Sequence, residues 1–188
     1  MSPVSLTAYD PVWPALAEAY GKAFSSLGSL LTIHHIGSTS VPGLRAKPTI
    51  DLMPVVATLE ALDPERAAIE DLGYAWRGEY GITGRRYCTL TENTETGSER
   101  RVNAHFFAAG SPQISRHLAF RDYLRSHPDA CRAYEAEKRR AQTLYPRDSR
   151  AYAREKSGWI SAAHDRADAW YLQSQAISSA ARKRDTIL

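Results

Sequence analysis

Residue types that could bind a phosphate and a metal ion lie close together in the first third of the chain. Gly37, Ser38 and Thr39 directly follow a short β-branched segment, and Asp51 lies within the next apolar segment. Glycine lets backbone amides approach an anion closely, and the two hydroxyls can donate further hydrogen bonds. Mg²⁺ is bound in proteins by carboxylate together with phosphate oxygens. The spacing therefore predicts a phosphate-binding loop with Asp51 as a magnesium ligand.

A purely structural interpretation competes with this one. Gly37, Ser38 and Thr39 could form a simple turn, and Asp51 could be a capping or salt-bridged residue. The neighbours of Asp51, including Ile50 and Leu52, predict a buried strand. A lone buried carboxylate costs several kcal/mol unless it is paired or bound to a metal. This cost favours the functional interpretation, because something must offset the charge.

Cationic and imidazole side chains further along the chain could complete the site. Arg85 and Arg86 stand at the start of a predicted strand, and arginine can bind phosphate or carboxylate in a bidentate manner. Adjacent strand residues point to opposite faces, so at most one of the two arginines can serve a site, and either could lie at a solvated sheet edge. His105 shares a strand face with Asn103 and could be a metal ligand, an acid–base group, a phosphate donor or a structural residue.

The second half of the chain adds a basic helical stripe and an inward lysine. His117, Arg121 and Arg125 are spaced four residues apart and lie along one side of a predicted helix, where such a stripe is usually solvated. Lys156 falls within the apolar stripe of the last helix. A lysine there should have an anionic partner, and this partner could be the ligand, unless the side chain snorkels to the surface.

Apolar periodicity and turn residues predict the elements that carry these side chains. The order of helix, strand, loop, strand, helix, three strands and a run of helices predicts an α+β fold, with a mixed β-sheet, flanking helices and a C-terminal helical half. Helices are expected at residues 11–27, 64–72, 112–126, 128–144 and 149–171, and strands at 30–36, 49–56, 74–77, 86–91 and 101–107.

Length and composition limit the class of protein. With 188 residues and 43% hydrophobic content, we expect one domain over residues 1–172, followed by a flexible basic tail at 173–188. The net charge of +3 suits anionic ligands. It does not favour nucleic acid, because stacking aromatics interleaved with a basic stripe are not evident.

The expected location is the cytoplasm. Cys88 and Cys131 cannot form a disulfide framework, and the first residues lack a basic leader and an apolar signal region. No window approaches the roughly 18 consecutive apolar residues of a membrane span. We therefore expect a soluble protein in a reducing compartment that has no membrane partner.

Six motifs together carry a resemblance to a known family. They are residues 35–39 (His-Ile-Gly-Ser-Thr), 41–44 (Val-Pro-Gly-Leu), 47–48 (Lys-Pro), 50–51 (Ile-Asp), 84–86 (Gly-Arg-Arg) and 117–124 (His-Leu-Ala-Phe-Arg-Asp-Tyr-Leu). Over about residues 5–165 the chain resembles the GrpB family (UPF0157-type), whose members belong to the nucleotidyltransferase superfamily. The resemblance implies a nucleotidyltransferase-like sheet and a site around the first of these motifs.

The chain departs from the superfamily pattern at the metal site. The superfamily places two acids one residue apart and a third acid on a neighbouring strand, whereas this chain has Asp51, Met53 and His105 at those positions. GrpB relatives commonly show His-x-His near His105, and here Asn103 replaces the first histidine. Two metals need bridging carboxylates. A site with one metal, or with none, therefore fits this sequence better.

The leading hypothesis is a protein that binds a nucleoside triphosphate, or another phosphorylated small molecule, with Mg²⁺ on Asp51. It would transfer a nucleotidyl group to an unknown acceptor, with catalytic roles for Asp51, Lys47 and His105. The residues expected to bind phosphate or nucleotide are His35, Gly37, Ser38, Thr39, Arg85, Arg86, His117, Arg121 and Lys156.

Two other activities remain open on the same fold. The first is a catalytically degenerate protein that binds a nucleotide or coenzyme, and the absence of the second carboxylate favours it. The second is an ATP-dependent ligase or kinase-like activity, because a fold does not fix the chemistry. Some GrpB relatives are joined to a dephospho-CoA kinase domain, which points to coenzyme or nucleotide metabolism.

Overall fold

The computed structural model describes residues 4–94, 97 and 99–185, and for residues 175–185 it describes the backbone only. The chain forms two compact units. The sheet unit is Ser5–Ser115, and the helical unit consists of the described residues of Met1–Val4 and Arg116–Leu188. The predicted single domain of residues 1–172 thus includes all of the sheet unit and much of the helical unit.

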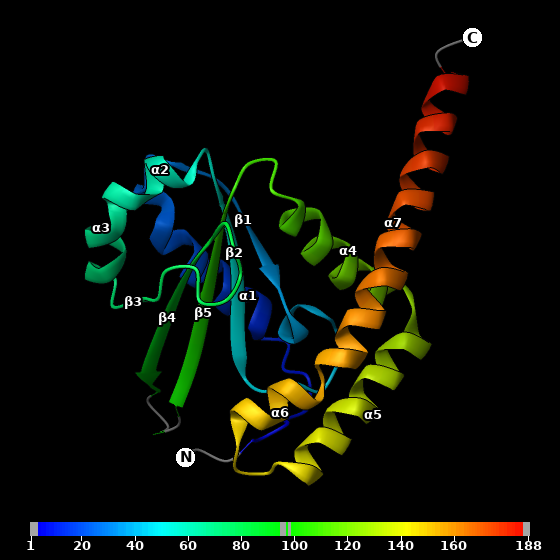
Figure 1. Cartoon of the computed structure of the whole chain (residues 1–188), viewed down its shortest axis with the longest axis horizontal. Helices are drawn as coiled ribbons and strands as arrows, with labels where there is room; N and C mark the ends of the chain where they lie inside the picture. Colours follow the sequence, from blue (N-terminus) through cyan, green and yellow to red (C-terminus); the bar gives the residue numbers. More distant parts are fainter. Residues whose placement is uncertain (1–3, 95–96, 98, 186–188) are drawn as a thin grey trace. The chain divides into compact units, whose positions relative to one another are not determined.

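The sheet unit is built on a five-stranded mixed sheet (Figure 1). Its strands are β1 (Leu30–Ile36), β2 (Thr49–Val56), β3 (Ala75–Trp76), β4 (Arg85–Asn93) and β5 (Glu99–Ala108), in the order β1-β2-β5-β4-β3. Strands β2 and β5 pair in parallel, and the other neighbours are antiparallel. This mixed sheet with its flanking helices confirms the predicted α+β class.

Short helices precede β1 and join β2 to β3. They are α1 (Trp13–Lys22), α2 (Leu59–Leu62) and α3 (Arg66–Asp71), with 3₁₀ turns at Ala23–Ser26, Ser38–Ser40 and Asp63–Glu65. Just before α1, Asp10 Oδ1 accepts a hydrogen bond from the Val12 amide at 2.9 Å. The helix predicted at 64–72 is a 3₁₀ turn that contains Pro64, followed by α3.

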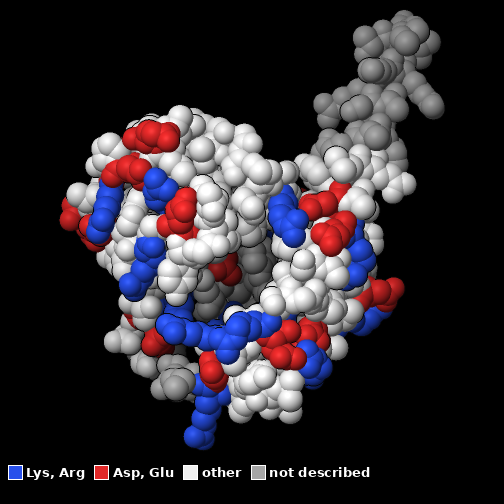
Figure 2. All heavy atoms as spheres, viewed as in Figure 1, with Lys and Arg blue, Asp and Glu red and all other residues white. Residues whose placement is uncertain are grey.

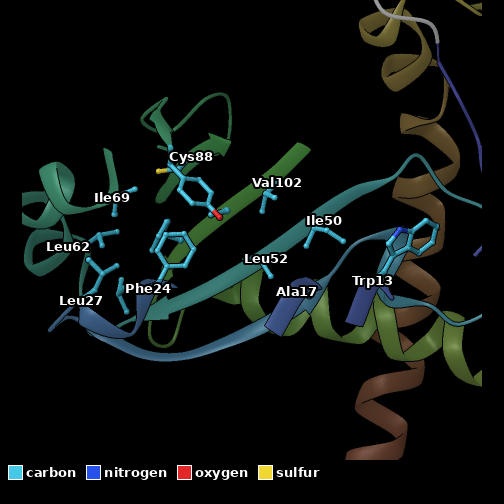
Figure 3. Packing of buried hydrophobic residues seen from close by; sticks show 14 of the residues in the cluster. Trp13, Ala17, Phe24, Leu27, Ile50, Leu52, Leu62, Ile69, Cys88 and Val102 are labelled. Carbon is cyan, nitrogen blue, oxygen red and sulfur yellow. The ribbon is translucent and has the colours of Figure 1, made fainter. Parts of the chain in front are cut away.

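The hydrophobic core lies on the α1 face of the sheet. Trp13, Ala17 and Phe24 from the first helical segment pack with Ile50 and Leu52 of β2 (Figure 3). Phe24 and Phe106 of β5 meet edge to face, with ring centroids 5.2 Å apart. The apolar side of α1 therefore packs against every second residue of the strands, and this packing fixes the register of the sheet.

The opposite face of the sheet carries the polar candidates. Successive strand side chains point to opposite faces, so burying Ile50 and Leu52 turns Asp51 away from the α1 core. Strand β5 behaves in the same way, because Val102 and Ala104 enter the core. On the face away from α1, called the site face, lie Asp51, Arg85, Tyr87, Asn103 and His105.

The helical unit contains the end of the chain. Its helices are α4 (Pro112–Ser126, whose first turn belongs to the sheet unit), α5 (Pro128–Leu144), α6 (Ser149–Glu155) and α7 (Ser157–Asp185). Asp148 caps α6 by accepting hydrogen bonds from the amides of Arg150 and Ala151, both at 2.9 Å. The predicted bounds of α4 and α5 agree with the structure.

The last predicted helix differs from the structure in two ways. Residues 149–171 form two helices that are separated at Lys156, and the second helix continues past Tyr171 to Asp185. Residues 172–185 contain no glycine or proline, and alanine favours the helix, so nothing in the sequence stops it. The predicted flexibility of residues 173–188 stays a prediction, and residues 186–188 lie outside the described part.

Charged side chains of both signs are interspersed on the face of the molecule in Figure 2. Several form local ion pairs along helices, such as Arg66 with Glu70 at 2.9 Å and Arg139 with Glu135 at 2.7 Å. Among the described residues, no helix has the length and apolar character needed to cross a membrane.

Candidate functional site

Gly37 brings the backbone of the predicted phosphate loop directly against Asp51. Gly37 follows β1 in a left-handed conformation, with a φ of 71°. The last residue of β1, Ile36, pairs with Asp51 of β2. A Cβ placed at Gly37 would overlap Oδ2 of Asp51 and lie 3.0 Å from the Asp51 Cβ and Cγ. Only glycine fits here, for both conformational and steric reasons.

Two side chains predicted to bind phosphate instead hold the loop in shape. Thr39 is buried, and its hydroxyl donates to the Thr49 carbonyl at 3.0 Å. Because that hydroxyl has a single hydrogen, it must accept from Nε2 of His35, also at 3.0 Å. His35 pairs with Leu52 and so lies on the α1 side of the sheet, away from the Asp51 side chain. Phosphate binding by His35 and Thr39 stays a prediction, with both side chains engaged in holding the loop.

Ser38 remains the hydroxyl suited to an incoming ligand. The side chain is partly exposed and forms no hydrogen bond with any residue in the described part of the chain. The next serine, Ser40, is engaged, because its hydroxyl donates to the Gly37 carbonyl at 2.6 Å. The loop therefore offers one ready hydroxyl beside the Gly37 backbone.

Asp51 is fixed by an amide and an imidazole from the neighbouring strand. Asn103 Nδ2 donates to Asp51 Oδ1 at 2.7 Å, and His105 Nε2 lies 3.7 Å from the same oxygen. The Asp51 side chain is 24% exposed and that of His105 is 15% exposed. The predicted need for a group to offset the buried carboxylate is met by these two side chains. Enough of Asp51 is still open to accept a ligand.

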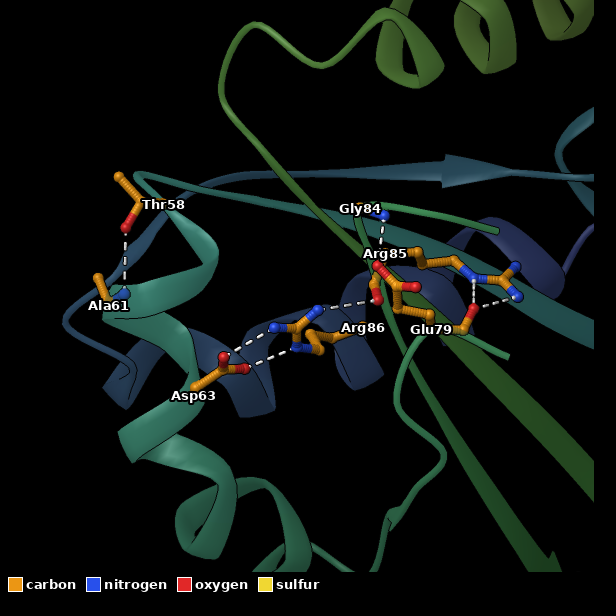
Figure 4. A network of polar contacts seen from close by, with 7 residues as sticks. All are labelled: Thr58, Ala61, Asp63, Glu79, Gly84, Arg85 and Arg86. Atoms are coloured by element: carbon orange, nitrogen blue, oxygen red, sulfur yellow. Dashed lines mark hydrogen bonds and ion pairs between the residues drawn. The ribbon is translucent and has the colours of Figure 1, made fainter. Parts of the chain in front are cut away.

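Arg85 orients His105 and anchors the β3–β4 loop. Its Nη1 lies 3.1 Å from His105 Nδ1. A guanidinium can only donate, so Nδ1 accepts and the His105 hydrogen is on Nε2, toward Asp51. Arg85 also donates to the carbonyl oxygen of Glu79, at 3.1 and 3.2 Å (Figure 4), and to that of Tyr80, at 2.7 Å. It is only 5% exposed, and burial lowers its pKa. Arg85 is therefore a positioning residue for the site.

Arg86 lies on the opposite face of β4 and serves the fold. Its guanidinium forms a bidentate pair with Asp63, at 2.6 and 2.7 Å (Figure 4). This hydrogen bonding raises the pKa of Arg86 and lowers that of Asp63. The structure therefore separates the two arginines, as strand geometry predicts, and phosphate binding by Arg86 stays a prediction.

Lys47 brings positive charge to the segment before β2. It is half-buried, and burial lowers its pKa, assisted by Arg101. The Asp51 carboxylate acts in the opposite sense on the same pKa. Lys47 is thus close enough to Asp51 for their charges to interact, and its catalytic role stays a prediction.

The residues around Asp51 fit one hard cation held in part by its ligand. Among the described residues, no group of three or more His, Cys, Asp or Glu side chains could hold a metal ion. Asn103 Oδ1 is buried and has no hydrogen-bond partner within the described part of the chain. Together with Asp51 this gives one carboxylate and one amide oxygen, which suits Mg²⁺ that is also coordinated by phosphate.

The remaining predicted residues lie in the helical unit. Arg121 pairs with Asp122 at 2.7 Å, and the His117 ring lies 6.3 Å from that of His164. Lys156 stands at the junction of α6 and α7, with its Nζ 4.3 Å from the Tyr152 ring centroid. The parts that His117, Arg121 and Lys156 would take in ligand binding stay predictions.

A buried lysine in α5 was missed by the sequence analysis. Lys138 is 1% exposed, and its Nζ lies 4.6 Å from the Tyr134 ring centroid. Burial lowers its pKa to about 7, and the charge of Lys156 contributes. Lys138 stands in a run of charged residues and so resembles solvated surface. The signal that could have found it is its spacing from the buried Tyr134 and Ala141, which places all three on one helical stripe.

These features define an α+β protein with a carboxylate, an amide and an imidazole beside a glycine loop. The family model described as GrpB protein matches residues 3–166. That match covers most of the chain, which therefore belongs to the GrpB family.

Three relatives illustrate the similarity. The UPF0157 protein YqkA of Bacillus subtilis is 38% identical over 75% of this chain and 40% of its own length. The dephospho-CoA kinase of Mycolicibacterium paratuberculosis is 29% identical over 90% of this chain and 47% of its own length. The crystal structure of the conserved protein GrpB from Enterococcus faecalis matches with a TM-score of 0.79 and 32% identity, over 89% of this chain and 99% of that chain. The chain thus spans less than half the length of the first two relatives.

Proposed function

We propose that the chain binds a magnesium-associated nucleoside triphosphate at the Asp51 site and transfers a nucleotidyl group to an acceptor. The observation that carries the proposal is the Asp51 carboxylate, which lies against the left-handed Gly37 backbone and is held in place by Asn103. A carboxylate beside a close-approach glycine suits a cation and a phosphate that bind together.

Each side chain of the site has a distinct proposed role. Asp51 and the Asn103 Oδ1 atom would hold the cation, and Ser38 would donate to a phosphate oxygen. Lys47 would neutralise charge that develops on the phosphates. When bound, Mg²⁺ supplies Lewis-acid polarisation of a phosphoryl oxygen. His105 carries its hydrogen on Nε2, 3.7 Å from Asp51 Oδ1, so its positive edge would face the carboxylate without a direct hydrogen bond.

The relatives support a nucleotide or coenzyme as the ligand class. One of them is named a dephospho-CoA kinase, and its alignment covers nearly all of this chain but less than half of the kinase. The shared segment thus accompanies nucleotide or coenzyme chemistry in that relative. We propose the same ligand class for this chain.

A binding protein without catalysis is the second candidate. The structure places buried Met53 two residues after Asp51, at the position where the superfamily has its second acid. A two-metal clamp on the attacking and leaving oxygens needs bridging carboxylates. The single carboxylate favours binding without transfer.

The test is a calorimetric titration with ATP, GTP, CTP, UTP and coenzyme A, with and without Mg²⁺, followed by measurement of released pyrophosphate. We expect Asp51→Asn to fold and to lose Mg²⁺-dependent binding, because asparagine has nearly the same shape but no charge. Asp71→Asn is the matched control, since Asp71 is exposed at the end of α3. Equal affinity of the parent and Asp51→Asn for Mg-ATP would show that Asp51 is structural. Binding without pyrophosphate release would favour the second candidate.

A further inference from the structure

Tyr80 combines an uncommon backbone conformation with an exposed aromatic ring. Its φ is 43°, and among the described residues it is the one non-glycine residue with a positive φ. This conformation is costly for a residue with a bulky side chain and persists where the surroundings enforce it. Tyr80 is also 62% exposed, so burial of its ring does not compensate for the backbone. Non-glycine residues in this region cluster at functional sites.

The surroundings that enforce this conformation belong to the candidate site. Arg85, which is buried, donates to the carbonyl oxygens of Glu79 and Tyr80. The Glu79 carboxylate in turn accepts from the Gly84 amide at 2.7 Å and closes the β3–β4 loop on itself (Figure 4). The same guanidinium contacts His105. Tyr80 is therefore tied to the site by a rigid residue.

A continuous row of rings leads from Asp51 to Tyr80. His105 lies 3.7 Å from the carboxylate, and its ring centroid is 4.9 Å from that of Tyr87. The Tyr80 ring stacks on Tyr87, with centroids 5.3 Å apart and planes 23° from parallel. Tyr87 thus supports Tyr80 from one side, while much of Tyr80 stays open to solvent.

We propose that Tyr80 is a stacking platform for the nucleobase of the ligand whose phosphates bind at Gly37, Ser38 and Asp51. This inference rests on the proposed function and deepens it. A nucleotide carries its base at the opposite end of the ribose from its phosphates, so one ligand can contact both ends of the row. Stacking on an aromatic ring accepts any base, because every base has a π-face. The platform therefore favours nucleotides over other phosphorylated compounds without strong selection among bases.

The experiment compares calorimetric affinities for Mg-ATP and for inorganic tripolyphosphate with Mg²⁺. We expect the parent protein to bind ATP more tightly than tripolyphosphate, and Tyr80→Ala to weaken ATP about tenfold while leaving tripolyphosphate unchanged. Tyr80→Trp should keep the preference for ATP. Tyr80→Gly relieves the backbone, so it should keep or raise the melting temperature and still lose the preference. Tyr145→Ala is the control, since Tyr145 is an exposed tyrosine of the helical unit.

The outcomes separate this inference from the proposed function. Equal affinity of the parent for ATP and tripolyphosphate, or an unchanged preference in Tyr80→Gly, would overturn the platform and leave the phosphate site standing. Failure of the parent to bind either compound would overturn the proposed function and the platform together. A loss of tripolyphosphate affinity equal to the loss of ATP affinity in Tyr80→Gly would show that Tyr80 shapes the phosphate loop instead, which also refutes the platform.

Discussion

The backbone at Gly37 leaves no room for a side chain, and this makes Gly37→Ala the sharpest test of the site geometry. Alanine would have to adopt a φ of 71° with a ψ of −172°, a region nearly confined to glycine, which costs about 1–3 kcal/mol. Its Cβ would also overlap the Asp51 carboxylate. Forcing an extra carbon into an occupied space costs about 1–3 kcal/mol. We therefore expect a loss of about 2–6 kcal/mol in unfolding free energy.

Gly43 is a matched control in the same loop. It has a φ of 79°, and a Cβ built there meets no atom within 4 Å. Gly43→Ala should therefore cost only the backbone term, about 1–2 kcal/mol. The difference between the two variants combines the contact between residue 37 and Asp51 with the extended ψ of −172° at Gly37. Urea-induced unfolding, followed by circular dichroism, measures both values on the same scale.

A double variant makes the reasoning refutable. Asp51→Ala removes the overlapping carboxylate and keeps the Cβ of residue 51, 3.0 Å from the added carbon, so Gly37→Ala in that background should cost less than it does in the parent. Residues in contact are non-additive, and the expected coupling is about 1–3 kcal/mol. If Gly37→Ala is no more destabilising than Gly43→Ala in the parent, the carboxylate does not lie against the loop, and the proposed cation and phosphate geometry fails with it.

Two further predictions concern the loop and the buried Lys138. Ser38→Ala should weaken Mg-ATP more than adenosine in a titration, whereas Thr39→Val should lower the melting temperature, because the Thr39 hydroxyl bridges His35 and Thr49. Burial lowers the Lys138 pKa from 10.5 to about 7. Between pH 7 and 10.5 the unfolded chain holds more protons on this lysine than the folded chain does. The unfolding free energy of the parent should therefore rise with pH over this range, by up to about 1.4 kcal/mol per pH unit. Below pH 7 the lysine is charged in both states, and its burial lowers the unfolding free energy by a constant amount. Urea unfolding from pH 7 to 9 should show a shallower rise in Lys138→Met, and equal slopes would contradict the buried charge.

Sequence reasoning succeeded where the information is local. The bounds of β1 and β2 agree with the prediction, because Gly28 and Gly37 flank the first apolar run and Pro48 precedes the second. A short loop between antiparallel neighbours then brings Gly37 beside Asp51, as predicted. Placing both residues required only the order of elements along the chain.

The missed features depend on partners that are distant in sequence. His35 lies on the α1 side because Ile36, and not His35, pairs with Asp51, and this register is set across the sheet. The Arg85 guanidinium donates hydrogen bonds to two backbone carbonyl oxygens and to His105. Residue types alone do not show which backbone groups a side chain will contact. The separation of α6 from α7 at Lys156 was equally hidden, since neither glycine nor proline occupies that position.

Core residues and site residues alternate along β2 and β5. The packing of the hydrophobic core therefore also aligns the polar side chains of the site. Asp51 and Asn103 pair in register because their neighbours Leu52 and Ala104 are buried together on the other side. A slip of one residue between these strands would turn Asp51 toward the α1 core and Leu52 away from it, so misaligned states are disfavoured. Such a register error should therefore coincide with unfolding, and the folded population should be uniform in its ligand affinity.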